Sequence, residues 1–256
     1  MSLNLSTSNS LPRDAERATL VGRLWQPGVG PVLVAVHEGG LHDLSKLAPT
    51  MSDLLEGKKP PAEAVRAALQ DGQAPRIAAL DAVLANSDET ARDAGRPWLL
   101  APCDLQVIKA SGVTFVASLL ERVIEEQARG DASKAEATRA AIGQVLGDNL
   151  ADIVPGSPEA AKVKEVLLAQ GVWSQYLEVG IGPDAEIFTK APVLAAVGTG
   201  ADVGIHSGSV WNNPEPEVVL AVNSQGHVRG AALGNDVNLR DFEGRSALLL
   251  LSLIHI

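Results

Sequence analysis

Cysteine is nearly absent from this chain, because Cys103 is the only one among 256 residues. A single thiol cannot form an internal disulfide, so the sequence excludes a disulfide-stapled extracellular scaffold and favours a reducing, cytoplasmic location. Aromatic residues are also scarce, at 3%. We therefore expect alanine, valine and leucine to build the hydrophobic core.

An excess of basic residues is missing as well. The net charge is -10, which argues against binding to nucleic acid or to an anionic membrane surface. The longest apolar run, SALLLLSLIHI, is far shorter than the roughly 20 residues of a membrane-spanning helix. The N-terminus lacks the continuous apolar segment of a signal peptide. These absences leave a small-molecule ligand as the expected partner.

Several common site motifs are missing too. The five histidines do not have the spacing of a zinc site. The sequence contains no P-loop, no Rossmann fingerprint and no G-x-S-x-G elbow. The chemistry of the chain must therefore be sought among its carboxylates.

The chain nevertheless has a globular balance, with 46% hydrophobic and 20% charged residues. Residues 1–16 are polar, and we expect them to be disordered. Short β-type runs and helices alternate over residues 17–104, which is typical of a small α+β domain. Helical spacing over 118–130, 133–147 and 157–171 predicts a helical insertion, in which Ser157 caps the last helix. The β-type runs that follow include a predicted hairpin over 217–234.

Two glutamates stand at the start of that hairpin, in NNPEPEVVL. Residues two apart point to one face of a strand, so the carboxylates of Glu215 and Glu217 can converge. The returning strand ends at Asp236, and three such oxygen ligands suit Mg²⁺ or Mn²⁺. The alternatives are a solvated acidic edge for the glutamates and a turn role for Asp236. The apolar residues after Glu217 favour a buried strand, in which clustered charges would need a counter-ion.

The residues around these acids resemble the fumarylacetoacetate hydrolase superfamily. The resemblance rests on PEPEVVLAVNSQGHVRGAALGNDVNLRDFEG and on the preceding AEIFTK segment, and it is close over residues 181–250. The segment KASGVTFVASLLERVIEE resembles an earlier family motif more loosely. The resemblance implies an α+β fold, with a mixed β-roll of the family's C-terminal-domain type, incomplete here, a small N-terminal domain and a helical insertion. It also implies Mg²⁺ or Mn²⁺ on Glu215, Glu217 and Asp236, and a homodimer.

One position indicates the branch. C–C hydrolases and decarboxylases of this family usually carry glutamine seven residues after the third ligand, where this chain has Glu243. Together with W-x-x-PEPE, Glu243 makes the chain similar to the 2-keto-3-deoxy-pentonate dehydratases. The resemblance implies dehydration of a 2-keto-3-deoxy sugar acid through a metal-stabilised enolate. A C–C hydrolase or decarboxylase acting on acylpyruvate-type substrates, and a non-catalytic metal or sugar-acid binding protein, are the alternatives.

Individual roles follow from the same resemblance. It implies that Glu186 and Glu243 are catalytic, and that the substrate contacts come from Lys190, Arg240, Arg122 and Thr114. Each has a plainer alternative: an exposed strand glutamate for Glu186, a surface position for Lys190, and a helix surface for Arg122. Arg240 can instead support the metal site from behind, which we favour, or form a surface ion pair with Asp241.

The sequence departs from the family after Leu250. The lysine that the dehydratases carry soon after this point is missing, and LSLIHI does not resemble the family. We therefore expect residues 105–250 to form a truncated catalytic domain and 251–256 a non-native tail. Missing strands would expose unpaired edges and apolar faces. On this hypothesis the 256-residue chain is inactive, and a version extended with the family's C-terminal sequence is active.

Overall fold

The computed structural model covers all 256 residues and describes most of them. The described residues are 3–112, 153–169 and 187–243, with the short stretches 124, 128–129, 131, 133–136, 171, 173, 178, 180, 182–183 and 245. The chain divides into two units. The first combines residues 1–107, 192–203 and 217–234, and the second combines 108–191, 204–216 and 235–256.

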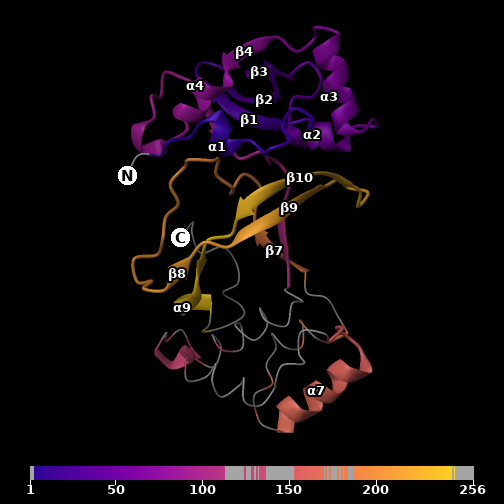
Figure 1. The fold of residues 1–256 in the computed structure, drawn as a ribbon, viewed down its shortest axis with the longest axis vertical. Coiled ribbons are helices and arrows are strands. Elements are labelled where there is room, and N and C mark those ends of the chain that lie inside the picture. Colours follow the sequence, from indigo (N-terminus) through magenta and orange to yellow (C-terminus); the bar gives the residue numbers. More distant parts are fainter. Residues whose placement is uncertain are drawn as a thin grey trace. The chain divides into compact units, whose positions relative to one another are not determined.

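A five-stranded antiparallel sheet organises the first unit (Figure 1). Its strands run in the order β4-β3-β2-β1-β5. The strands are β1 Val21–Gln26, β2 Gly30–His37, β3 Gly40–Asp43, β4 Arg76–Ala79 and β5 Trp98–Leu100. All five lie within residues 17–104, where the sequence predicted short β-type runs alternating with helices.

Both faces of this sheet are buried. Alternate residues of β2 point to opposite sides of the sheet, and each set packs in a different core cluster. Leu33 and Ala35 pack with Leu54 and Val65, which belong to α2 Met51–Glu56 and α3 Pro61–Gln70. Val32 and Val34 pack instead with residues of α4 Leu80–Ala85. The core of this unit therefore lies in two layers, one on each side of the sheet.

The first unit also contains two short helices. These are α1 Thr7–Ser10 and the 3-10 helix η1 Glu89–Ala91. The segment for which we expected disorder thus contains α1, and the amide of Leu3 donates to Asp88 at 2.7 Å. The expected division into domains at residues 17, 105 and 251 stays a prediction.

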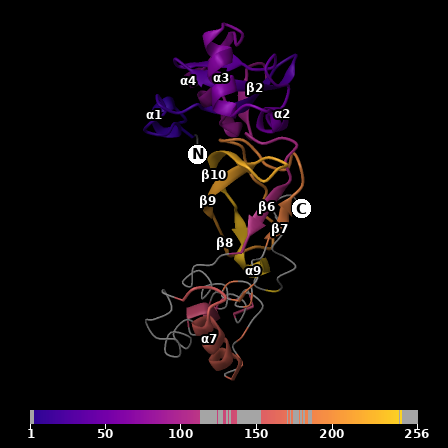
Figure 2. The same cartoon turned by 90° about the vertical axis from the view of Figure 1, so that its right-hand side faces the viewer.

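The second unit contains two small sheets. Strand β6 Ile108–Ser111 pairs antiparallel with β7 Ile187–Ala191 (Figure 2). Strand β8 Asn212–Asn213 pairs antiparallel with β11 Asn238–Leu239, which leads into α9 Arg240–Glu243. These elements hold three of the candidate site residues, Lys190 in β7 and Arg240 and Glu243 in α9.

The last helix of the expected insertion is confirmed as α7 Pro158–Ala169. Its first turn is capped as expected, because the amide of Ala160 donates to Oγ of Ser157 at 3.1 Å. The other two expected helices, over 118–130 and 133–147, lie mainly outside the described residues. None of the helices in the described ranges has the length and apolarity needed to cross a bilayer.

The expected hairpin is confirmed as β9 Pro216–Val222 and β10 Val228–Asn235. Its turn is closed by the amide of Asn223, which donates to the carbonyl of His227 at 3.0 Å. Gly226 adopts a φ of 80° there, a conformation that suits glycine. However, the expectation that β9 is buried is wrong: Val218 is 71% exposed and Leu220 is 55% exposed. Apolar sequence alone does not bury a strand, because burial needs a packed layer on its face.

Candidate metal centre

Three carboxylates converge where the two strands of the β9–β10 hairpin begin and end. Glu215 precedes β9, Glu217 lies in it, and Asp236 follows β10. One carboxylate oxygen from each lies within 4.8 Å of the other two. The backbone sets this register, because the amide of Asp236 donates to the carbonyl of Glu215 at 2.9 Å. The amide of Glu215 in turn donates to Oδ1 of Asn235, also at 2.9 Å.

This arrangement fits a hard divalent cation. Mg²⁺ binds oxygen at about 2.0–2.1 Å, so opposite ligands of one ion stand about 4.2 Å apart and neighbouring ligands closer. Oxygens within 4.8 Å of one another would therefore have to move closer together to bind one ion. Glu217 is exposed, whereas Glu215 and Asp236 are half-buried. The cluster is consequently accessible from solvent on the Glu217 side.

Lys190 lies beside the third carboxylate. Its Nζ is 2.9 Å from Oδ2 of Asp236 and 3.9 Å from Oε1 of Glu243. The side chains of Lys190 and Glu243 are only 10% and 4% exposed. A buried carboxylate is costly unless a cation or hydrogen-bond donor faces it. Lys190 on β7 and Glu243 on α9 therefore belong to the same charged cluster as Asp236.

Arg240 lies beside the first carboxylate. Its Nη2 is 3.0 Å from Oε1 of Glu215, and its Nε donates to Oδ1 of Asn213 at 2.8 Å. A planar guanidinium held at two points has little freedom to rotate, so it fixes the carboxylate that it contacts. Arg240 thus contacts the acidic cluster through Glu215.

The surface ion pair considered for Arg240 and Asp241 is not formed. Asp241 is 2% exposed, and its two oxygens accept from Oγ of Ser209 and from the amide of Val210, each at 2.8 Å. Arg240 and Asp241 therefore form hydrogen bonds with different residues. The roles of Asn213, Asn235 and Ser209 were not predicted from the sequence. Asn213 and Asn235 could have been suspected from the sequence, because both are polar residues that flank the acidic ligands. Ser209 had no such indication.

Three further residues with expected roles lie outside the described residues. They are Glu186, Arg122 and Thr114, which the family resemblance assigned to catalysis or substrate binding. Their roles stay predictions. Within the described residues, the structure brings together Glu215, Glu217, Asp236, Lys190, Arg240 and Glu243.

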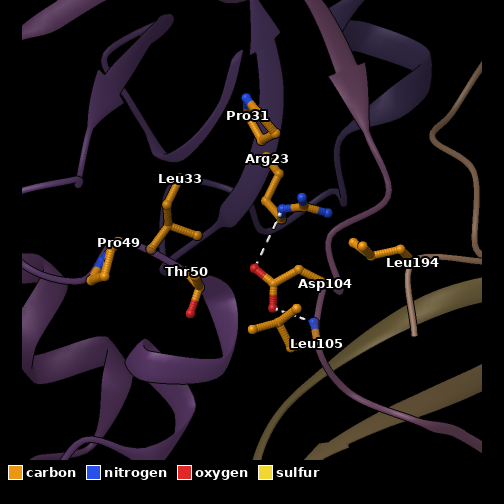
Figure 3. Close-up of a pocket in the computed structure, with 8 residues that line it drawn as sticks. All are labelled: Arg23, Pro31, Leu33, Pro49, Thr50, Asp104, Leu105 and Leu194. Carbon is orange, nitrogen blue, oxygen red and sulfur yellow. Dashed lines mark hydrogen bonds and ion pairs between the residues drawn. The ribbon is translucent and has the colours of Figure 1, made fainter. Parts of the chain in front are cut away.

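The first unit has a pocket of its own, of about 240 Å³ (Figure 3). Arg23 and Asp104 face each other there, with Nε of the arginine 3.5 Å from Oδ2 of the aspartate. Arg23 also donates from Nη1 to the carbonyls of Ala101 and Cys103, at 3.1 and 2.6 Å. The remaining walls are mainly apolar: Pro31, Leu33, Pro49, Thr50, Leu105 and Leu194.

The charged groups of this pocket are engaged within the fold. Asp104 accepts from the amides of Met51 and Ser52 at the start of α2, at 2.7 and 3.1 Å. Burial raises the pKa of Asp104, but hydrogen bonds from Leu105, Met51 and Ser52 outweigh that effect and hold the pKa below its ordinary value. Burial also raises the pKa of the neighbouring Cys103 thiol, which keeps it protonated and a poor nucleophile. We therefore assign this pocket a structural role.

Part of the chain is similar in sequence to two sugar-acid dehydratases. No family model matches it. A segment of 65 residues is 38% identical to the 2-dehydro-3-deoxy-D-arabinonate dehydratase of Saccharolobus solfataricus, covering 25% of this chain and 22% of that protein. A segment of 75 residues is 35% identical to a probable 2-keto-3-deoxyxylonate dehydratase of Haloferax volcanii, covering 29% and 26%.

The chain is also similar in fold to a solved structure. A hexagonal crystal form of a 2-keto-3-deoxyarabinonate dehydratase matches 90% of this chain with a TM-score of 0.50 and 17% sequence identity. The chain spans 60% of the length of that structure, and the matched segments span less than a third of the two relatives. The α+β fold is confirmed, and so is the resemblance of the chain to the dehydratase branch of the fumarylacetoacetate hydrolase superfamily.

Proposed function

We propose that this chain carries the metal centre of a dehydratase that removes water from a 2-keto-3-deoxy sugar acid, a pentonate, with Mg²⁺ or Mn²⁺. The observation that carries the proposal is the convergence of Glu215, Glu217 and Asp236 within 4.8 Å. The named activities of the two similar proteins, both dehydratases of such acids, give the substrate class.

The composition of the cluster supports a divalent ion. All three proposed ligands are carboxylates, the ligand type that Mg²⁺ and Mn²⁺ prefer over softer sites. Glu243 adds a fourth carboxylate, while Lys190 and Arg240 add one positive charge each. The described cluster thus has two more acidic than basic groups, an imbalance that one divalent ion would neutralise.

The dehydration needs a base for the C3 proton and an acid for the C4 hydroxyl, which together leave as water. When bound, the cation would supply Lewis-acid polarisation of the substrate's 2-oxo group. Glu243 is buried next to the Lys190 ammonium, which makes it a candidate for one of the two proton transfers. Glu186 is the proposed partner for the other. Arg240 keeps Glu215 oriented.

The test is an assay of water loss from 2-keto-3-deoxyarabinonate and 2-keto-3-deoxyxylonate with and without Mg²⁺. Because we expect activity to require the family's C-terminal sequence, both the 256-residue chain and an extended version are assayed. Glu217→Gln in the extended version is the matched control, and we expect it to abolish turnover. Mg²⁺-dependent dehydration supports the proposal. Cleavage of an acylpyruvate instead, or metal binding without turnover by either version, would overturn it.

Two further attributes belong to this proposal. We infer a homodimer from the family resemblance, and a cytoplasmic location from the single, half-buried Cys103. Light scattering on the eluted peak of a gel-filtration column measures the first. A monomeric mass at micromolar concentration would contradict it.

A further inference from the structure

Asp241 follows Arg240 directly in the chain and carries a buried carboxylate. It makes no described contact with the three proposed metal ligands. It is 2% exposed. Its Oδ1 accepts from Oγ of Ser209 and its Oδ2 from the amide of Val210, each at 2.8 Å. Burying a carboxylate costs free energy unless donors satisfy it. Both of its oxygens are engaged by one segment, so Asp241 ties residues 209–210 to α9.

A second contact holds the same segment. The ring of His206 packs against Phe242, the next residue of α9, with centroids 4.7 Å apart. Within the segment, the amide of Gly208 donates to Nδ1 of His206 at 3.1 Å, and the amide of Ser209 donates to the carbonyl of His206 at 2.9 Å. Residues 206–210 therefore form a closed turn that is fixed to α9 by two consecutive side chains.

The segment continues directly into the support of the metal centre. Strand β8 follows it, and Oδ1 of Asn213 in β8 accepts from Nε of Arg240 at 2.8 Å. Arg240 then reaches Glu215 through Nη2 at 3.0 Å. Asp241 and Arg240 are adjacent in α9. This short helix therefore contacts the 206–213 segment at residues 209–210 through Asp241 and at Asn213 through Arg240. The position of Arg240 depends on where the 206–213 segment lies.

We propose that Asp241 is a positioning residue for the metal centre. By fixing residues 209–210 it holds Asn213 and Arg240 in place, and thereby keeps Glu215 oriented toward the cation. The inference rests on the proposed function, because it presumes that Glu215 is a ligand. Removing outer contacts of metal ligands typically weakens metal binding about 10- to 100-fold. Since Asp241 acts through two intermediates, we expect the lower end of that range.

The experiment measures Mn²⁺ and Mg²⁺ affinity, by electron paramagnetic resonance and calorimetry, on variants of the full 256-residue chain. Asp241→Asn should weaken binding about 10-fold. Ser209→Ala removes one donor to Asp241 and should weaken metal binding less than Asp241→Asn does. Ser209→Thr keeps the hydroxyl and should bind metal as tightly as wild type. Because the two residues act together, the double variant Asp241→Asn/Ser209→Ala should bind no more weakly than Asp241→Asn alone.

Asp104→Asn is the matched control. Asp104 is also a buried aspartate that accepts from a backbone amide and a serine hydroxyl, but in the first unit. The Asp104→Asn variant should have a lower thermal unfolding midpoint than wild type and the same Kd for the metal. Equal Kd values for wild type and Ser209→Ala, or equal weakening by Ser209→Ala and Ser209→Thr, would overturn the inference even if Asp241→Asn fails to fold. If wild type binds no metal, the proposed function falls with it, whereas tight binding that none of these variants changes overturns this inference alone.

Discussion

Nζ of Lys190 lies 2.9 Å from Oδ2 of Asp236, inside a cluster that also holds Glu215, Glu217 and Glu243. Such a cluster is strained by like-charge repulsion, and the ammonium offsets part of that repulsion when no metal is bound. The lysine therefore stabilises the metal-free protein, while a bound cation would relieve the same repulsion.

Lys190→Met should lower the free energy of unfolding in EDTA by about 1.5 to 3 kcal/mol, the usual contribution of a hydrogen bond to a charged group. In saturating Mg²⁺ the difference from wild type should shrink. Urea unfolding under the two conditions measures both values. The control is Lys109→Met, because Lys109 is exposed and donates to Thr189 on the same strand pair at 2.7 Å. An equal loss with and without Mg²⁺ would contradict this account of Lys190.

Arg240→Lys should weaken divalent metal binding about 10-fold, because an ammonium cannot hold Asn213 and Glu215 in the fixed geometry of a guanidinium. Calorimetric titration with Mg²⁺ measures the change. Arg245→Lys is the matched control, since Arg245 lies over the ring of Phe242 at 4.3 Å and has no described contact with the acidic cluster. Unchanged affinity in Arg240→Lys would remove Arg240 from the metal centre.

The pKa of Asp104 predicts a dependence of stability on pH. Because its folded-state pKa is depressed, the stabilisation is present above the unfolded value of about 3.9 and is lost as pH falls through the folded value. Asp104→Asn should therefore be less stable than wild type at pH 7 by about 1 to 3 kcal/mol. The gap should narrow below about pH 4. Urea midpoints from pH 7 to pH 3 test this, and a gap that widens with acid would show the sign to be wrong.

Arg229 on β10 should matter for the stability of the first unit. It donates to the backbone carbonyls of Leu55, in the last turn of α2, and of Gly57 and Lys59, just after that helix, at 3.1, 2.6 and 2.6 Å. Arg229→Ala removes all three bonds and should cost about 1.5 to 3 kcal/mol. Proteolysis at the hairpin should accelerate in parallel. Ser224→Ala, which removes one contact with Glu56, should have a smaller effect, and the reverse order would contradict this account of the hairpin.

The sequence predicted elements whose signals are local. The N-cap of α7 at Ser157 and the hairpin over 217–234 depend on neighbouring residues, so both could be predicted from the local sequence. The acidic pair and Asp236 were also predictable, because strand periodicity and hairpin register bring them together. These features needed no knowledge of distant contacts.

Features that depend on tertiary contacts were not predictable. The sequence favoured a buried β9, yet Val218 is exposed, because burial depends on which layer covers a strand. Adjacent opposite charges suggested an ion pair between Arg240 and Asp241, but α9 directs the two side chains to different partners. The roles expected of Glu186 stay predictions, since this residue lies outside the described part of the chain.

A titration of the 256-residue chain with Mn²⁺, monitored by electron paramagnetic resonance and compared with Glu217→Gln, tests the central claim most directly. Glu217 is the exposed member of the cluster, so the neutral, equally large glutamine should disturb the fold little. We predict that wild type binds one equivalent, that Mg²⁺ displaces it, and that Glu217→Gln binds at least about 10-fold more weakly. Equal affinity in the two proteins, or no binding by wild type, would contradict the assignment of Glu215, Glu217 and Asp236 as a metal centre.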